Sequence, residues 1–511
     1  MYGDTAAAAD SALIRRMRYL AALVAGVASV LAFAPFDQSW VAPVAVAVLF
    51  WTWTGLTPRP AALAGFAYGC GLFLGGTYWT YISIRVFGEA PAALAVFLML
   101  GLVALMAAYY AGLGYVARRW LFPHGGVAML LLWPAAWMLS EWLRSWVMTG
   151  FPWLSLGYSQ LDTPLAGFAP VLGVFGVSLA GVMSAGAILL LRRPLSQAGI
   201  CALAVLAVLW GGGAALRNVE WTEPADKPIS VSLVQGAISQ DRKWLVEERL
   251  PTLRLYRELV DAELGRDLIV LPEAAIPLLM HRAAGYLDAL ATAARNEGSE
   301  IVLGILRRAR SDGPVFNSIV VLGETPQIYD KRHLVPFGEY FPVPGFVRDW
   351  MRLLSLPYSD LGVGGARQPV LQTTVAALAP SICYEDAFGE QMLAFLPQAG
   401  MLVNVSNDAW FGDSIAPHQH LQIARMRSVE AGRATLRATN TGISAVIDHH
   451  GKLLAQSPQF EVSVLRADVS VRTGATPFVR FGNLAVVALA LVLIAAGTAL
   501  GRRQVVSGRR R

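Results

Sequence analysis

The stretch APAALAVFLMLGLVALMAAYYAGLGYVA (90–117) contains no Asp, Glu, Lys or Arg. A helix rises about 1.5 Å per residue, so about 20 apolar residues cross the hydrocarbon core of a bilayer. Seven further windows of at least 18 residues also lack these four residue types: 19–36, 38–58, 60–84, 120–140, 163–191, 194–216 and 481–501. The sequence therefore predicts a multi-pass α-helical membrane bundle with eight transmembrane helices.

The composition agrees with a membrane protein. Hydrophobic residues make up 55% of the 511 residues and charged residues 15%, against about 45–50% and about 25% in soluble domains. So much apolar sequence excludes a disordered chain. The three cysteines, Cys70, Cys201 and Cys383, are too few and too scattered for a disulfide scaffold or a zinc cluster.

Arginines predict the orientation, because loops on the cytoplasmic side are enriched in basic residues. With the N-terminus in the cytoplasm, the short outer loops hold only Arg85 and Arg144. Thirteen arginines then lie inside: Arg15, Arg16, Arg18, Arg59, Arg118, Arg119, Arg192, Arg193, Arg502, Arg503, Arg509, Arg510 and Arg511. Both termini are expected in the cytoplasm and residues 218–478 outside, which in a bacterium is the periplasmic side of the inner membrane. Much of the net charge of +6 thus comes from arginines that set the membrane orientation. We therefore expect no nucleic-acid partner.

Between 218 and 478, short β-branched runs alternate with amphipathic stretches, which favours an α/β domain. Strand-like runs include ISVSLVQG (229–236) and DLIVLPE (267–273). Residues 420–439 are predicted to form one long helix, and 443–451 and 461–471 a closing strand pair. The expected domains are a seven-helix region at 1–217, an outer domain at 218–478, and an eighth transmembrane helix with a basic tail at 479–511.

Three chemically capable side chains stand at the ends of strand-like runs in the outer domain. Cys383, within SICYE (381–385), stands at the end of an apolar run, Glu273 ends LPE, and Lys331 follows a third run. Strand ends and the loops after them are where α/β folds carry reactive groups. Taken singly, each residue has an ordinary interpretation: a buried inert thiol, a solvated loop carboxylate and a surface lysine. Together they provide a nucleophile, a base and an electrostatic stabiliser.

Several ordered motifs resemble the Glu–Lys–Cys signatures of the nitrilase (carbon–nitrogen hydrolase) superfamily. They are LPE (271–273), YDKRHLVPFGEYFP (329–342), SICYED (381–386) and NVSNDAWFG (404–412), followed by HQHLQIARMRSVEAGR (418–433). A nitrilase-like domain between seven spans and one is similar to the bacterial apolipoprotein N-acyltransferase family. The segments SEWLRSW (140–146), GFPWLSLGYSQ (150–160) and VQGAISQDRKW (234–244) also look like that family.

The resemblance implies an αββα sandwich and a ping-pong acyltransferase. The sn-1 acyl chain of a phosphatidylethanolamine-like phospholipid would pass to a Cys383 thioester, and then to the N-terminal amine of a diacylglyceryl-cysteine apolipoprotein. Glu273 would be the general base and Lys331 the oxyanion stabiliser. The alternative is a membrane-bound nitrilase-type amidase or hydrolase, because the triad is the same and only the acceptor differs.

The resemblance also implies supporting residues, each with a plain structural alternative. Glu339 would hold Lys331 or Cys383, or form a salt bridge within its loop. Tyr384 and Glu385 would orient the nucleophile loop. Trp244 would contact substrate, or anchor the chain at the membrane interface.

Further expectations concern how lipids reach the site. Glu141 and Arg144 stand three apart at the outer end of the fifth span, either as a local ion pair or as phospholipid head-group contacts. GFPWLSLGYSQ (150–160) is expected to form a re-entrant or interfacial loop at the substrate entrance. Residues 337–357 are expected to form a mobile arm that contacts membrane lipids.

No metal or cofactor is expected. The histidines His418 and His420 form an HxH pair that is a poor ligand set, and glycine-rich nucleotide motifs are lacking. A transporter is disfavoured, because the spans show neither paired repeats nor internal charges.

Overall fold

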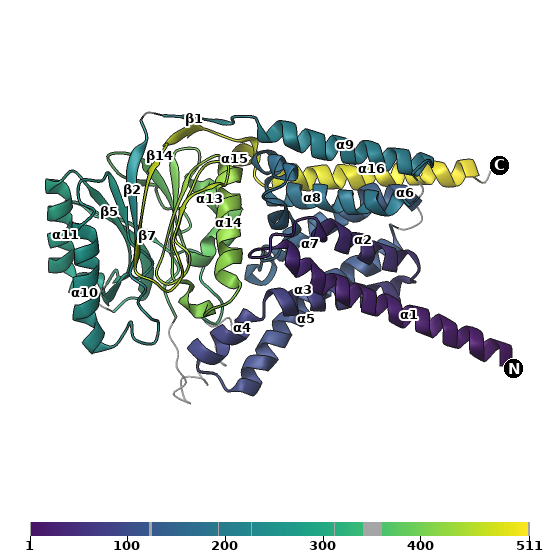
Figure 1. Ribbon diagram of the computed structural model, residues 1–511, viewed down its shortest axis with the longest axis horizontal. Helices are drawn as coiled ribbons and strands as arrows, with labels where there is room; N and C mark the ends of the chain where they lie inside the picture. Colours follow the sequence, from purple (N-terminus) through teal and green to yellow (C-terminus); the bar gives the residue numbers. More distant parts are fainter. Residues whose placement is uncertain are drawn as a thin grey trace. The chain divides into compact units, whose positions relative to one another are not determined.

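Apolar helices and a β-sandwich form two compact units in the computed structural model, which describes residues 2–121, 125–192, 194–225, 227–310, 312–340 and 360–508. One unit is Glu220–Val479, and the other comprises the chain before and after it (Figure 1). The expected arm at 337–357 falls largely outside the described residues, as do Arg193 and Arg509–Arg511 of the arginine count.

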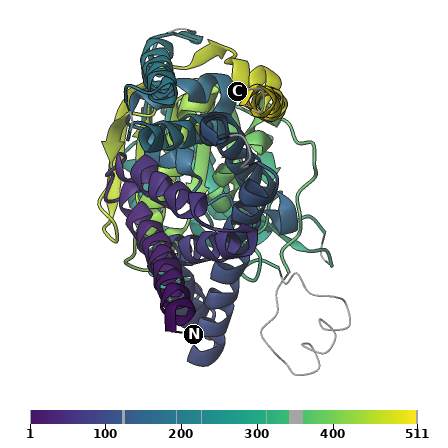
Figure 2. The ribbon, with the colours of Figure 1, turned by 90° about the vertical axis from the view of Figure 1, so that its right-hand side faces the viewer.

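The first unit is helical. Its longer helices are α1 (Tyr2–Ser29), α2 (Val41–Thr54), α3 (Pro58–Gly76), α5 (Ala92–Arg119), α7 (Trp133–Arg144), α8 (Ala169–Leu190), α9 (Gln197–Arg217) and α16 (Leu484–Gly508). The short α4 (Trp79–Ile82) and α6 (Gly125–Val127) join them. Helix α3 packs against α1 and α5, α8 against α2, α7 and α9, and α16 against α7. Figure 2 views this unit nearly along α16.

Small residues allow the closest of these helix contacts. A Cβ at Gly65 of α3 would lie 2.1 Å from the Tyr110 carbonyl oxygen of α5, and one at Gly26 of α1 would lie 2.1 Å from the Tyr68 carbonyl oxygen. Helices in membranes associate through such close backbone approach, since lipid tails provide no hydrophobic drive between them.

Five helical stretches of the described chain are long and apolar enough to cross a membrane: Ala92–Arg119, Gly125–Arg144, Pro164–Leu190, Gln197–Arg217 and Leu484–Arg502. The prediction of eight transmembrane helices is therefore supported only in part, because five of the described stretches qualify. Helix α2 has 14 residues, α3 begins Pro-Arg-Pro and is rich in glycine, and the apolar part of α1 after Arg18 ends at Ser29. These three windows do form helices, but each is shorter or more polar than a standard span.

The second unit contains two large sheets and one two-stranded sheet. The strands are β1 (Thr222–Pro224), β2 (Ile229–Gln235), β3 (Leu268–Val270), β4 (Ile276–Leu279), β5 (Glu300–Arg308), β6 (Val315–Leu322), β7 (Gln327–Asp330), β8 (Leu371–Gln372), β9 (Ala377–Ile382), β10 (Met401–Ser406), β11 (Thr435–Thr439), β12 (Ala445–Ile447), β13 (Leu453–Gln456), β14 (Ser463–Val469) and β15 (Arg472–Gly474). One sheet has the order β14-β2-β3-β5-β6-β7, with β4 beside β5, and the other β13-β12-β11-β10-β9-β8. Strands β1 and β15 form a separate antiparallel pair.

The core lies between these two sheets. Val231 and Val270 of the first sheet and Val403 and Leu436 of the second belong to one buried apolar cluster. Helices α10 (Val246–Asp261) and α11 (Ala284–Asn296) contribute Tyr256 and Leu290 to a second cluster on the outer face of the first sheet. Helix α14 (Ala416–Ala431) packs against β11 and β12 of the second sheet. The layers are therefore helix, sheet, sheet, helix (Figure 1).

Two sequence expectations for this unit are wrong. The helix expected over 420–439 ends at Ala431, because Gly432 adopts a left-handed conformation with φ 61°, and Thr435–Thr439 then forms β11. Glycine stops a helix readily in this conformation. The expected closing strand pair also fails, since β12 pairs with β11 and β13, whereas β14 pairs with β2 in the other sheet.

Candidate active site

Glu273, Lys331 and Cys383 each follow a strand of the sandwich. Lys331 comes directly after β7, Cys383 directly after β9, and Glu273 three residues after β3. Strand β9 is parallel to β10, with Ile382 opposite Val405, so the carboxyl ends of both strands share one sheet edge. The Lys331 backbone N–H donates to the Asn317 carbonyl oxygen at 2.9 Å, which fixes where this lysine leaves the first sheet.

Lys331 lies between two carboxylates. Its Nζ is 2.8 Å from Glu339 and 4.0 Å from Glu273 Oε1, and its side chain is 1% exposed. The Asn317 amide Nδ2 donates to Glu273 Oε1 at 2.6 Å and contacts Glu339 Oε1 at 3.3 Å. A buried cation must be paired to stay charged, and here two carboxylates pair with the ammonium while the Asn317 amide holds those carboxylates.

The charges of this cluster determine the protonation states of Lys331 and Glu273. Burial alone would lower the pKa of Lys331, but Glu339 and Glu273 outweigh it and raise that pKa, so the ammonium stays protonated. Burial raises the pKa of Glu273, with Glu339 adding to the rise and Lys331 opposing it. A carboxyl whose pKa is raised toward neutrality is suited to exchange a proton during a reaction.

The Cys383 thiol is buried and neutral at rest. Burial raises its pKa well above the usual range, the Glu273 charge raises it further, and the Lys331 charge lowers it. Both charges therefore act on the sulfur. A neutral thiol is a weak nucleophile, so this cysteine requires a base to remove its proton as it reacts.

The backbone at Cys383 is strained. Its φ is 53°, in the left-handed region that non-glycine residues rarely adopt. The Cys383 carbonyl oxygen accepts from Asn404 Nδ2 and from His420 Nε2, each at 3.3 Å. Strain of this kind persists only where neighbours over-determine it, and it gathers at functional sites.

Glu385 connects the loop that begins at Cys383 to the loop that begins at Lys331. Its Oε2 accepts from the Ile382 N–H at 2.8 Å, before the cysteine. Its Oε1 accepts from the Tyr329 hydroxyl at 2.8 Å, and from the backbone N–H groups of Arg332 at 2.7 Å and His333 at 3.1 Å. One buried carboxylate thus joins the ends of β7 and β9.

The other predicted site residues occupy varied positions. The Tyr384 ring packs edge-on against Phe388, with centroids 5.0 Å apart. Trp244 is 43% exposed. The neighbouring Lys243 is 1% exposed and donates from Nζ to the Glu273 carbonyl oxygen at 3.1 Å. Burial lowers the pKa of Lys243 to about 8, against the opposing charge of Glu273.

Glu141 and Arg144 are buried in the helical unit. Glu141 Oε1 accepts from the Trp137 indole at 2.8 Å and from the Leu156 N–H at 2.9 Å. Arg144 Nη1 donates to the carbonyl oxygens of Phe151 and Trp153, each at 2.6 Å. Both side chains therefore support the 150–160 segment, whose second half, Leu156–Gln160, is a 3₁₀-helix. Their role toward a lipid head group stays a prediction.

A second buried charge cluster lies behind the nucleophile loop. Arg437 donates to Asp386 at 3.1 Å and to Asp408 at 2.9 Å. His420 contacts the same two carboxylates, at 2.8 Å for Asp386 and 2.9 Å for Asp408. Burial and Arg437 lower the pKa of His420, but the two aspartates outweigh them and raise it to about 9. Both ring nitrogens of His420 therefore contact carboxylates, and Nε2 also lies close to the Cys383 carbonyl oxygen.

Sequence reasoning missed Lys243, Asn317 and this second cluster. Asn317 and Glu273 are 44 positions apart, and Lys243 and Glu273 are 30 apart. Asn317 belongs to the strand-like run NSIVVLG, and Lys243 directly precedes Trp244, which was predicted to contact substrate. Only the pairing of β6 with β7, which brings Ser318 opposite Asp330, shows that Asn317 and Lys331 are neighbours.

Two family models match parts of this chain. A family model described as carbon-nitrogen hydrolase matches residues 230–478. A second, described as the apolipoprotein N-acyltransferase N-terminal domain, matches residues 25–187. A solved carbon-nitrogen hydrolase from Helicobacter pylori G27 is 17% identical, with a TM-score of 0.37, and covers 48% of this chain and 89% of its own.

Curated relatives match nearly the whole chain. A protein named apolipoprotein N-acyltransferase from Nitrosomonas europaea is 43% identical over 493 residues, which is 94% of this chain and 97% of the relative. A protein of the same name from Photobacterium profundum is 40% identical, covering 91% of this chain and 92% of the relative. Another from Methylococcus capsulatus is 40% identical, with 95% and 96% covered.

Proposed function

Because this chain belongs to the apolipoprotein N-acyltransferase family, we propose that it moves the sn-1 acyl chain of a phospholipid through a Cys383 thioester to the N-terminal amine of diacylglyceryl-cysteine apolipoproteins. The chain is a bacterial membrane protein with an acyltransferase activity on lipoproteins. The route of the acyl group and the role of each residue are the parts proposed.

In the first half-reaction, Glu273 accepts the Cys383 thiol proton while the sulfur attacks the ester carbonyl carbon. The carbon–sulfur bond forms and the carbonyl oxygen becomes an oxyanion. When the intermediate collapses, the ester C–O bond breaks and Glu273 returns the proton to the leaving glycerol oxygen. The products are a thioester and a lysophospholipid. The neutral buried thiol and the raised pKa of Glu273 support this order of proton transfers.

In the second half-reaction, the apolipoprotein amine attacks the thioester. Glu273 takes a proton from the attacking nitrogen, the C–S bond breaks, and the sulfur recovers a proton as the amide forms. Each half-reaction passes through an oxyanion that Lys331 stabilises. The ammonium suits this role because Glu339 and Glu273 keep it charged in a buried setting.

The single observation that carries the proposal is the buried Glu273–Lys331–Glu339 cluster, whose charges act on Cys383. Glu339 positions the lysine, and Glu385 and Tyr384 orient the nucleophile loop. We assign Trp244 to substrate contact, because its ring is exposed next to buried Lys243.

The membrane arrangement is also part of the proposal. All eight apolar windows span the inner membrane, with residues 1–217 as a seven-helix region and 479–511 as the eighth helix and cytoplasmic tail. The catalytic region 218–478 faces the periplasm, where phosphatidylethanolamine-like donors and apolipoproteins are available. Glu141 and Arg144 keep the 150–160 loop in shape near the entering lipid. A reporter fused after Arg511 that is active only in the periplasm would contradict this orientation.

The chemistry is tested by mass spectrometry of the full chain after exposure to phospholipid without acceptor. We expect one acyl mass on the peptide that contains Cys383, and release of the acyl group as an amide when a diacylglyceryl peptide is added. Cys383→Ser should carry no acyl mass, because a hydroxyl is a far weaker nucleophile than a thiol at neutral pH. Rapid release of free fatty acid without acceptor would instead indicate a hydrolase.

A further inference from the structure

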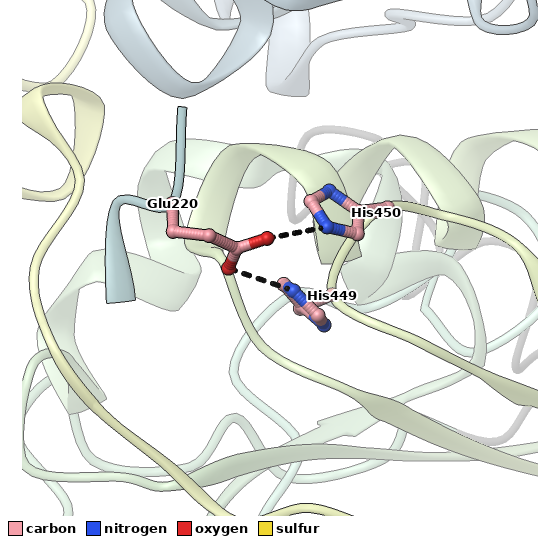
Figure 3. Close-up of side chains that lie close together, drawn as sticks. All are labelled: Glu220, His449 and His450. Carbon is pink, nitrogen blue, oxygen red and sulfur yellow. Dashed lines mark hydrogen bonds and ion pairs between the residues drawn. The ribbon is translucent and has the colours of Figure 1, made fainter. Parts of the chain in front are cut away.

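A group of ligand-bearing side chains lies outside the active site. Glu220, His449 and His450 converge, and the ligand atoms that they offer all lie within 4.8 Å of one another (Figure 3). Glu220 Oε1 is 2.9 Å from His450 Nε2, and Oε2 is 3.2 Å from His449 Nε2. We propose that these three side chains bind a divalent first-row cation of the zinc class.

A tight turn brings both imidazoles to the same side. Adjacent residues in an extended strand point in opposite directions, but His449 and His450 occupy the turn between β12 and β13. The Asp448 side chain accepts from the His450 N–H at 2.9 Å and from the Lys452 N–H at 2.8 Å. Gly451 then reverses the chain with φ 78°.

This turn is fixed to the helix behind it. Arg425 Nε of α14 donates to the Gly451 carbonyl oxygen at 2.7 Å. A Cβ at Gly451 would lie 2.7 Å from Val429 Cγ2, so the turn sits directly on the helix. The imidazoles are therefore held before any ligand arrives, which reduces the ordering cost of binding.

The carboxylate is oriented by a third group. Arg472 Nη2 donates to Glu220 Oε2 at 2.6 Å, while its Nε donates to Thr222 Oγ1 at 2.8 Å. Ligating carboxylates are commonly held in this way by an outer hydrogen bond. Arg472 occupies Oε2, so Oε1 is the natural ligand atom. The guanidinium also repels a cation, and we therefore expect weaker binding than in closed structural zinc sites.

The two imidazole rings present the same nitrogen to Glu220. Their centroids lie 3.9 Å apart, and each Nε2 contacts one oxygen of the Glu220 carboxylate. Neutral imidazole is the form that binds metal. Each ring would hold its proton on Nδ1 and offer Nε2.

The ligand set selects the kind of cation. Zinc binds imidazole nitrogen at about 2.0–2.1 Å with tetrahedral geometry, which separates ligand atoms by about 3.3 Å. The 2.9 Å between Glu220 Oε1 and His450 Nε2 needs only a small outward shift, and the ligand atoms of all three side chains already lie within 4.8 Å of one another. Two histidines and one glutamate leave one position for water. Magnesium and calcium prefer oxygen ligands and are poor candidates.

This proposal departs from the expectation of no metal, which considered only the pair His418 and His420. Glu220 precedes β1 at the start of the sandwich unit. A bound cation would clamp that entry segment to the β12–β13 turn and stabilise the folded unit by linkage. No catalytic role is assigned to it, and the proposal does not depend on the thioester mechanism.

The test measures Zn²⁺ and Co²⁺ binding to the full, tag-free chain in detergent. We expect one equivalent of Zn²⁺ to bind in competition with a chromophoric chelator, and Co²⁺ to give visible ligand-field absorption. Zn²⁺ should also raise the thermal midpoint, whereas Mg²⁺ and Ca²⁺ should not. The variants His449→Asn, His450→Asn and Glu220→Gln should each weaken Zn²⁺ binding by about tenfold or more.

The matched control is His281→Asn, which removes an exposed histidine elsewhere in the same unit. It should bind Zn²⁺ like the unaltered chain. The thermal midpoint measured without added metal serves as the folding check for all variants. Unchanged Zn²⁺ affinity in a folded His449→Asn/His450→Asn variant would overturn the proposal, as would a Co²⁺ spectrum that survives this double change.

Discussion

Two buried charge clusters flank the nucleophile loop, and they differ in how fully their carboxylates are satisfied. Around Lys331, Glu273 has one amide donor and a lysine Nζ 4.0 Å away, and burial raises its pKa. Around Arg437, Asp408 receives hydrogen bonds from Arg437, His420 and Ser406. Burial opposes ionisation there, but these partners hold the pKa of Asp408 far below its ordinary value.

We expect the first cluster to exchange protons and the second to keep its charges. Burial favours the neutral carboxyl in both clusters, but only around Asp408 do the donors outweigh it. We therefore expect changes near Lys331 to affect rate, and changes near Arg437 to affect stability.

The largest expected effect is on rate, in the first cluster. Glu273→Gln keeps the shape and removes the base, so both half-reactions should slow by about 10²–10⁴-fold. Lys331→Met removes the oxyanion stabiliser and should cost about 10²–10³-fold in each. Phospholipid binding is measured on the same variants. If Lys331→Met abolishes lipid binding yet acylates normally with saturating lipid, Lys331 is a head-group contact and not an oxyanion stabiliser.

The second prediction concerns stability. Arg437→Met leaves Asp386 and Asp408 buried without their main partner, and breaking a buried ion pair costs about 3–5 kcal/mol. Amide hydrogen exchange of β9, β10 and β11 in the full chain should report this loss. The control Arg257→Met removes an exposed pair with Asp261, which is worth less than about 1 kcal/mol. Equal protection in the two variants would contradict the division of roles.

A third prediction uses the acid limb of the pH–rate profile. Glu273 must be ionised to act as base, and its pKa lies above the ordinary carboxyl value. The acylation rate should therefore rise with pH through that raised value. The charge of Lys243 lowers the pKa of Glu273, so Lys243→Met should move the limb to higher pH. Lys227→Met, at an exposed position, should leave it in place.

The smallest expected effect is the pH dependence of stability from His420. Its folded pKa is about 9, against an ordinary 6.5. Its contribution is therefore fully present below about pH 6.5 and disappears as pH rises through about 9. The thermal midpoint of the unaltered chain should fall over this range. His420→Gln should flatten that fall, and an identical fall in both chains would show that His420 does not carry it.

The strand ends were predictable from the sequence, because short apolar runs that stop at LPE, YDK and SICYE mark both the strands and the reactive positions. The helix end at Gly432 was not recognised, since 420–439 keeps an amphipathic pattern across the glycine. Pro251 would suggest a helix break from sequence alone, but α10 continues through it.

The polar neighbours of the site, Asn317 and Lys243, could not be predicted from the sequence. Asn317 reaches Glu273 only because β6 and β7 pair beside each other. Lys243 reaches it through a loop whose course no local pattern specifies. Such contacts depend on tertiary packing, whereas periodicity reports only which face of an element is apolar.

The bridge made by Glu385 has a consequence for how the enzyme tolerates mutation. Lys331 follows a strand of one sheet and Cys383 a strand of the other, and this carboxylate bonds to the backbone beside both. A core substitution that shifts the two sheets relative to each other would change the spacing between Glu273, Lys331 and Cys383 while the fold survives. We therefore expect some apolar residues buried between the sheets to influence turnover as well as folding.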